Sequence, residues 1–80
     1  MSIAKYSAHR VMKRVVGRRV SLDAAELVAK YLTKVAGDIA IYAGRVAKES
    51  GRTVIRKKDV ALVLEIMGVD IEELEKMEIE

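Results

Sequence analysis

The residues with the clearest chemical capacity in this sequence are its cations, which gather in two short segments. Residues 1–22 hold six Lys or Arg and no acid, and residues 51–59 hold four Lys or Arg against one Asp. Arg56, Lys57 and Lys58 fall in the predicted first turn of a helix, where each cation opposes the helix dipole at a cost of about 0.3–1 kcal/mol. Backbone N–H groups left free at a helix start bind phosphate together with positive side chains. The two segments therefore indicate a polyanionic partner, with a merely solvated basic face as the alternative for the second.

The sequence offers little that could perform catalysis or hold a metal. It has no Cys and one His, and it lacks the HExxH, GxSxG and Walker-type patterns. His9 lies on a predicted basic helix face, where a surface residue or a phosphate neighbour is more common than a catalytic base. Seven acids fall in residues 60–80, where solvation and mutual repulsion explain them. We therefore expect no enzymatic activity, no cofactor and no metal.

The aromatic content and the hydropathy indicate which polyanionic partner is expected and whether a membrane is involved. There is no Phe or Trp and there are only three Tyr, which disfavours the base stacking used in single-strand and RNA recognition. Binding to the backbone of duplex DNA fits the cations better. No apolar run approaches the roughly 20 residues of a membrane span, and the first ten residues lack the apolar core of a signal peptide. The absence of Cys suits a reducing cytoplasm.

The element that must position these cations is one long helix, predicted over residues 21–50. A helix of 30 residues is a rod of about 45 Å, which the rest of an 80-residue chain cannot cover. A small chain without disulfides usually needs a partner chain, and a hydrophobic fraction of 51% leaves surplus apolar surface. We therefore predict a dimer whose interface is the apolar stripe of this helix. The stripe consists of Val28, Leu32, Val35, Ile39, Tyr42 and Val46.

Shorter helices are predicted on both sides of the long one, which makes the fold all-α. Residues 3–16 form an amphipathic helix with a basic outer face, and residues 56–67 form a third helix that is apolar nearly all round. A short fourth helix follows and has a narrow apolar edge. Arg18 and Arg19 lie in the connector before the long helix, where cations again stand beside a helix start. The predicted boundaries carry helix-ending glycines or capping residues: Gly17, Ser21, Gly51, Gly68 and Asp70.

Two spaced motifs resemble those of the archaeal histones. The first is Arg19-Val20-Ser21-x-Asp23-Ala24, and the second, beyond the long helix, is Gly51-Arg52-x-x-Ile55-x-x-x-Asp59-Val60. The resemblance covers residues 5–67, and the spacing between the motifs makes it fairly specific. It implies a histone fold over residues 1–68, in which two chains cross their long helices head to tail in a handshake. Residues 69–80 are then an acidic extension with a short helix.

The resemblance also implies roles for single residues. Arg10 and Lys13 match phosphate-facing residues of the first helix, and Arg19 matches an arginine that enters the minor groove. The segment from Thr53 to Arg56 matches a loop that lies beside residues 18–20 of the partner chain. These matches and the basic segments together give the predicted DNA-binding set. It consists of Arg10, Lys13, Arg14, Arg18, Arg19, Ser21, Thr53, Arg56 and Lys57.

Other matched positions concern the loop and the assembly. Arg52 and Asp59 match the family's internal Arg–Asp pair, which is structural. Thr53-Val54 stands where the family usually has Lys-Thr, so one cation is lost. Glu49 replaces a His that commonly contacts the Asp of a neighbouring dimer, and Glu49 opposite Asp59 would be unfavourable. The resemblance therefore argues against endless stacking of dimers. A closed tetramer would instead use other surfaces, namely Ile41, Tyr42, Ile71 and Leu74.

We therefore predict sequence-independent binding and compaction or bridging of double-stranded DNA by a homodimer or tetramer associated with the nucleoid. A heterodimer with another histone is a further option. The alternative is a histone-fold protein–protein interaction module with weak DNA binding, which the acidic tail and the altered loop favour. A helical repressor with sequence preference ranks last, because nothing in the sequence resembles a recognition helix.

Overall fold

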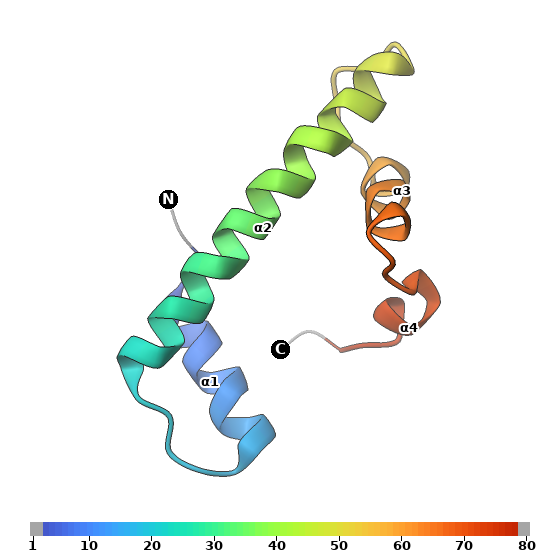
Figure 1. Ribbon diagram of the computed structural model, residues 1–80. Coiled ribbons are helices and arrows are strands. Elements are labelled where there is room, and N and C mark those ends of the chain that lie inside the picture. Colours follow the sequence, from blue (N-terminus) through green and yellow to red (C-terminus); the bar gives the residue numbers. More distant parts are fainter. Residues whose placement is uncertain (1–2, 79–80) are drawn as a thin grey trace. The chain divides into compact units, whose positions relative to one another are not determined.

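The computed structural model describes residues 3–78, and its regular structure is entirely helical. Residues 1, 2, 79 and 80 lie outside the described residues, and with them the outer ends of the predicted segments 1–68 and 69–80. No strand occurs between residues 3 and 78, which confirms the all-α prediction. The elements in order (Figure 1) are α1 (Lys5–Val16), α2 (Leu22–Glu49), α3 (Lys57–Ile66) and α4 (Ile71–Glu75).

The helices begin and end where local chemistry allows it. Gly17 takes a left-handed φ of 64° and its N–H donates to the Lys13 carbonyl at 2.9 Å, which closes the last turn of α1. The Ser21 hydroxyl oxygen accepts a hydrogen bond from the Ala24 N–H at 3.3 Å and so caps α2. The Asp70 carboxylate accepts from the Glu73 N–H at 3.2 Å and caps α4. These ends agree with the predicted boundaries to within two residues.

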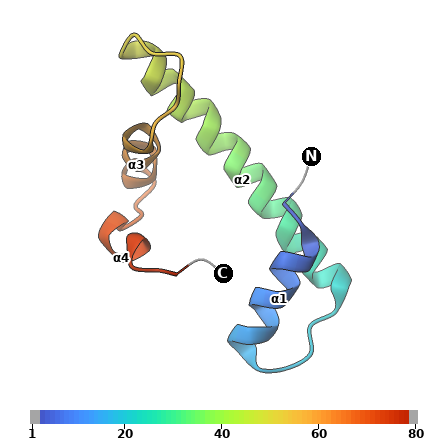
Figure 2. The same ribbon diagram turned by 180° about the vertical axis from the view of Figure 1, so that it is seen from behind.

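The chain forms two compact units, one up to Gly37 and one from Asp38 onward. Helix α2 contributes its first part to one unit and its second part to the other. In the first unit, α1 lies along the first part of α2 (Figures 1 and 2). Ala8, Ala25 and Ala29 are buried between the two helices, and Met12 and Val28 pack around them. The small alanine side chains let the two helices approach closely.

Polar contacts tie α1 and the residues before it to the rest of the first unit. The His9 Nε2–H donates to the Val20 carbonyl at 2.6 Å, which ties the connector before α2 to the middle of α1. The Thr33 hydroxyl accepts a hydrogen bond from the backbone N–H of Ile3 at 2.7 Å. His9 is therefore part of the scaffold that shapes this connector.

The second unit contains the remainder of α2, the following loop, α3 and α4. Ala43 and Ala47 of α2 and Val63 of α3 are buried there, and α4 packs against α3. Asp59 at the start of α3 is 1% exposed, and no larger side chain among residues 3–78 is buried as completely. A single chain therefore buries mainly alanines and one carboxylate.

Much of the predicted stripe on α2 is left uncovered by its own chain. Leu32 is 40% exposed and Tyr42 is 54% exposed, while Val35 is only half-buried. Val28 differs, because it already packs against the alanine cluster under α1. Side chains of this size are normally the first to be buried in a folded core. Within residues 3–78, a single chain therefore has no conventional core of large side chains.

Candidate nucleic-acid interface

Part of the first basic segment surrounds a shallow hollow at the start of α2. The hollow has a volume of about 400 Å³ and lies wholly within the first unit. It brings together three residues of the predicted DNA-binding set, Lys13, Arg19 and Ser21. All the lining residues are His9, Lys13, Arg19, Val20, Ser21 and Leu22.

The local sequence explains why these groups meet. The left-handed turn at Gly17 ends α1, and the bond from His9 to the Val20 carbonyl holds the returning connector beside α1. Lys13 lies one helical turn beyond His9 on the same face of α1. A cation from α1 and a cation from the connector are thereby placed next to the start of a 28-residue helix.

The electrostatics of this hollow combine attraction and a local counter-charge. The start of α2 carries positive helix-dipole character, which adds to the charges of Lys13 and Arg19. Asp23 lies in the first turn of the same helix. Hydrogen bonds from the Ser21 hydroxyl and then from the Ala24 N–H hold the pKa of the Asp23 carboxyl below its ordinary value, so it stays ionised at neutral pH. The hollow can accept an anion such as phosphate at its basic rim, while Asp23 offsets part of that attraction.

The other predicted cations of the first unit lie on exposed surface. Arg10 and Arg14 are on the exposed side of α1, and Arg18 is exposed in the connector. Thr53, Arg56 and Lys57 belong to the second unit and are also exposed. The predicted set therefore forms one group in each unit. The resemblance joins the two groups only through a partner chain.

The second basic segment is organised around a buried carboxylate. The Arg52 guanidinium donates from Nη2 to Asp59 Oδ1 at 2.6 Å and from Nη1 to Oδ2 at 2.8 Å. The same Nη1 donates to the Val54 carbonyl at 3.1 Å. The backbone N–H of Arg56 donates to Asp59 Oδ2 at 2.8 Å. Asp59 thus holds the loop before α3 by three hydrogen bonds. The predicted structural pair, Arg52 and Asp59, forms a bidentate ion pair.

This arrangement corrects the picture of a free helix start at residues 56–58. We expected Arg56 in the first turn with unpaired N–H groups open to phosphate, whereas α3 begins at Lys57 and Arg56 precedes it. The Arg56 N–H is already bound by the carboxylate of Asp59, which occupies the third helical position. An acid at that position closes the helix start from within, as in one half of a capping box. The side chains of Arg56, Lys57 and Lys58 remain exposed.

One residue of the predicted DNA-binding set, Lys57, forms an ion pair that the sequence analysis did not predict. Lys57 Nζ forms an ion pair with Glu75 Oε1 of α4 at 2.6 Å. No periodicity links these two residues, because the contact depends on the reversal of the chain between α3 and α4. The reversal passes through Gly68, whose φ of 87° favours glycine. A glycine after α3 and an apolar edge on the next helix are the signals that could have indicated it.

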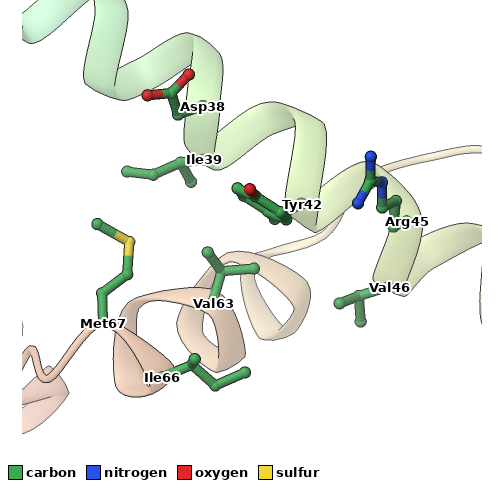
Figure 3. A pocket seen from close by; sticks show the side chains of 8 residues that line it. All are labelled: Asp38, Ile39, Tyr42, Arg45, Val46, Val63, Ile66 and Met67. Atoms are coloured by element: carbon green, nitrogen blue, oxygen red, sulfur yellow. The ribbon is translucent and has the colours of Figure 1, made fainter.

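An apolar hollow of about 470 Å³ lies in the second unit between α2 and α3. Figure 3 shows Ile39, Tyr42 and Val46 of the stripe on one side and Val63 of α3 facing them. Arg45 lies at the rim, with its guanidinium carbon 5.4 Å from the centre of the Tyr42 ring. The hollow is open and its walls are mainly hydrocarbon, which suits an apolar occupant rather than a polar substrate. The remaining lining residues are Asp38, Ile66 and Met67.

Residues 3–78 contain no group of three or more His, Cys, Asp or Glu placed to hold a metal ion. None of the helices described there combines the length and the hydropathy needed to cross a membrane.

The comparison with protein families decides what this arrangement of helices is. The family described as "Histone-like transcription factor (CBF/NF-Y) and archaeal histone" matches residues 3–64. The chain belongs to this family. Its short–long–short helices α1 to α3 are those of a histone fold, and α4 lies beyond the matched residues. The predicted resemblance to archaeal histones is thus confirmed.

Membership of the histone-like family carries a general functional meaning. The family associates the chain with DNA binding, with dimerisation of histone folds and with roles in chromatin or transcription. A comparison with curated proteins gives no match.

Proposed function

We propose that the protein is a histone-fold dimer that binds double-stranded DNA without sequence preference and compacts or bridges it. The observation that carries this proposal is the hollow at the start of α2, where Lys13 and Arg19 meet a capped helix N-terminus. Cations beside a helix start bind the phosphate backbone, which has the same chemistry in every sequence. No catalytic step, cofactor or metal is part of the proposal. The site of action is the nucleoid of the cytoplasm.

The second group of cations extends the proposed DNA-facing edge. Thr53 and Arg56 are exposed on a loop that the buried Asp59 carboxylate holds in place, and Lys57 is exposed at the first position of α3. A loop with a fixed backbone presents its cations without a large loss of conformational entropy on binding. In a handshake dimer this loop of one chain would lie beside the connector of the other chain. Each dimer would then carry two such combined basic edges.

The proposed dimer rests on the apolar surface that one chain leaves open. Leu32 and Tyr42 are substantially exposed, and the hollow between α2 and α3 has hydrocarbon walls. A second copy of α2 crossing the first would cover this stripe and fill the hollow. Burial of apolar surface stabilises by about 25 cal/mol per Å², so this cover would replace the missing core. A heterodimer with another histone would satisfy the same surface.

Assembly beyond the dimer is proposed to stop at a closed tetramer. Ile41 is 57% exposed on α2 next to Tyr42, and both remain available for contact between dimers. Ile71 and Leu74 line a hollow together with α3 of their own chain, and Leu74 is 41% exposed, so both stay part of the proposed tetramer surface. Glu49 stands where the resemblance implies a His that contacts a neighbouring dimer, so we propose that the family's usual stacking contact is lost and further stacking does not occur. We also propose a division of the chain into a histone fold over residues 1–68 and an extension over residues 69–80, which contains α4.

Reversing the charge of Arg19 should weaken DNA binding by on the order of tenfold or more in 0.1 M salt, because each dimer loses two DNA-facing cations and gains two repulsions. The measurement is a fluorescence anisotropy titration of a labelled duplex with the variant Arg19→Glu. The matched control is Lys30→Glu, which makes the same charge change on α2 at a lysine paired with Glu26 at 3.8 Å. An equal loss of affinity in both variants would show that only net charge matters, and would refute the assigned role of Arg19.

A protein–protein interaction module with weak DNA binding is the second candidate. Two observations favour it: the ion pair that engages Lys57, and the loop in which Thr53-Val54 carries no cation. Adding the protein to duplex DNA at low salt separates the two candidates. No complex at low salt would favour the interaction module, whereas a salt-sensitive complex favours the DNA-binding dimer.

A further inference from the structure

Helix α4 is folded back onto α3 by an apolar contact. Ile71 and Leu74 of α4 face Val60, Ala61 and Leu64 of α3 around a hollow of about 210 Å³. Ile71 is half-buried there, and the Asp70 carboxylate caps the start of α4. These contacts give the short helix a defined position within the second unit.

That position places an acid on a cation of the proposed DNA-facing edge. Glu75 at the end of α4 lies 2.6 Å from Lys57 Nζ, measured to Oε1. The Lys57 side chain is otherwise 83% exposed, so the lysine remains accessible to an external anion. Glu72 lies on the same helix, is exposed, and has no ion pair with Lys57. Of these two glutamates of α4, it is therefore Glu75 that pairs with Lys57.

We propose that α4 is an autoinhibitory element in which Glu75 competes with a DNA phosphate for Lys57. This inference rests on the proposed function, because it regulates the same basic edge. A carboxylate and a phosphate oxygen bind the same ammonium group, so the lysine serves one of them at a time. Glu75 is tethered through α4 and therefore acts at a high effective concentration. While Glu75 holds Lys57, each chain makes one phosphate contact fewer than its cations would allow.

The variant Glu75→Gln tests this competition. It should bind a duplex more tightly, and the slope of log affinity against log salt should become steeper by roughly 0.9 for each lysine released. With two chains in a dimer, the expected change is about 1.8 in the slope. The matched control Glu72→Gln removes the same charge from the same helix and should leave the slope unchanged. Equal slopes in the two variants would overturn the proposal.

A second readout needs no DNA and tests the contact itself. Acylation of lysine amines by a water-soluble acetylating reagent, followed by mass spectrometry, gives the reactivity of Lys57 relative to Lys58 in the free protein. Glu75→Gln should raise this ratio, and Glu72→Gln should not. An unchanged ratio would overturn the autoinhibitory contact even if every variant bound DNA. A raised ratio with an unchanged slope would also overturn it, because Lys57 would then not meet phosphate. Failure of all variants to bind DNA would instead remove the proposed function itself.

Discussion

Replacing Asp59 with asparagine lowers the midpoint of thermal unfolding by on the order of 10 °C, because it breaks a buried charge pair on one side only. Asp59 is 1% exposed and accepts from both Nη atoms of Arg52 and from the Arg56 N–H. Asparagine has the same shape but one acceptor oxygen. Its amide N–H₂ group would face donors, and at least one donor would lose its partner.

The control for this prediction is the variant Asp70→Asn. Circular dichroism measures the midpoint of thermal unfolding of both variants at equal protein concentration. Asp70 accepts one hydrogen bond at the start of α4 and is exposed, and asparagine caps helices about as well as aspartate. Its midpoint should therefore move by no more than a few degrees. Similar midpoints for the two variants would contradict the structural role given to Asp59.

The same carboxylate makes the stability depend on acid pH. The Arg52 guanidinium, and then the Arg56 N–H, hold the pKa of Asp59 far below its ordinary value. In the unfolded chain the pKa of an aspartate is about 3.9. Between this pKa and the lower pKa of Asp59 in the folded chain, the unfolded chain binds more protons than the folded chain. The stabilisation is therefore complete above about pH 4 and is lost as the pH falls further. The difference in midpoint between wild type and Asp59→Asn should shrink over that range and stay constant above it.

A glutamate at Leu32 should abolish dimerisation. Leu32 is 40% exposed in the single chain, so the glutamate would be tolerated there, but a handshake dimer would bury its charge. That burial costs on the order of 3 kcal/mol or more, which weakens the dimer at least about a hundredfold. We expect light scattering to give a monomer or an unfolded chain for Leu32→Glu at micromolar concentration. Duplex binding should fall with it, because the combined basic edges need two chains.

Leu27→Glu is the matched control for the dimer interface. It makes the same change on the same helix, but Leu27 is 71% exposed and lies outside the stripe. This variant should keep the mass and the DNA affinity of the wild type. If Leu32→Glu behaved like Leu27→Glu, the stripe would not be the interface and the handshake would be wrong.

The helix boundaries could be predicted because the signals are local. Gly17 and Ser21 flank a connector too short to place the helix ends elsewhere, and the structure ends α1 and starts α2 at those residues. The family resemblance placed Asp59 with Arg52, and that pair is present. It did not indicate the bond from the Arg56 N–H. An acid three residues after a helix-preceding residue is the capping-box spacing, so the sequence itself carries a signal for this contact.

Other contacts depend on how the chain reverses direction and have no local signature. His9 reaches the Val20 carbonyl, 11 residues away, only once the connector has turned back along α1. Lys57 meets Glu75 only once α4 has packed on α3. Sequence patterning places each of these residues on a helix face, but the partner on the opposing face comes from tertiary packing. The apolar hollow beside Val63 has the same origin, since two separate helices supply its walls.

The measurement that tests the central proposal most directly is the affinity for two unrelated duplexes as a function of salt concentration. A histone-fold dimer that engages six or more phosphates should give log affinity falling linearly with log salt, with a slope of about −5 or steeper. The two duplexes should give the same slope and closely similar affinities, because phosphate contacts carry no base information. Affinity that ignores salt, that is confined to one of the duplexes, or that is absent at low salt would contradict sequence-independent DNA binding.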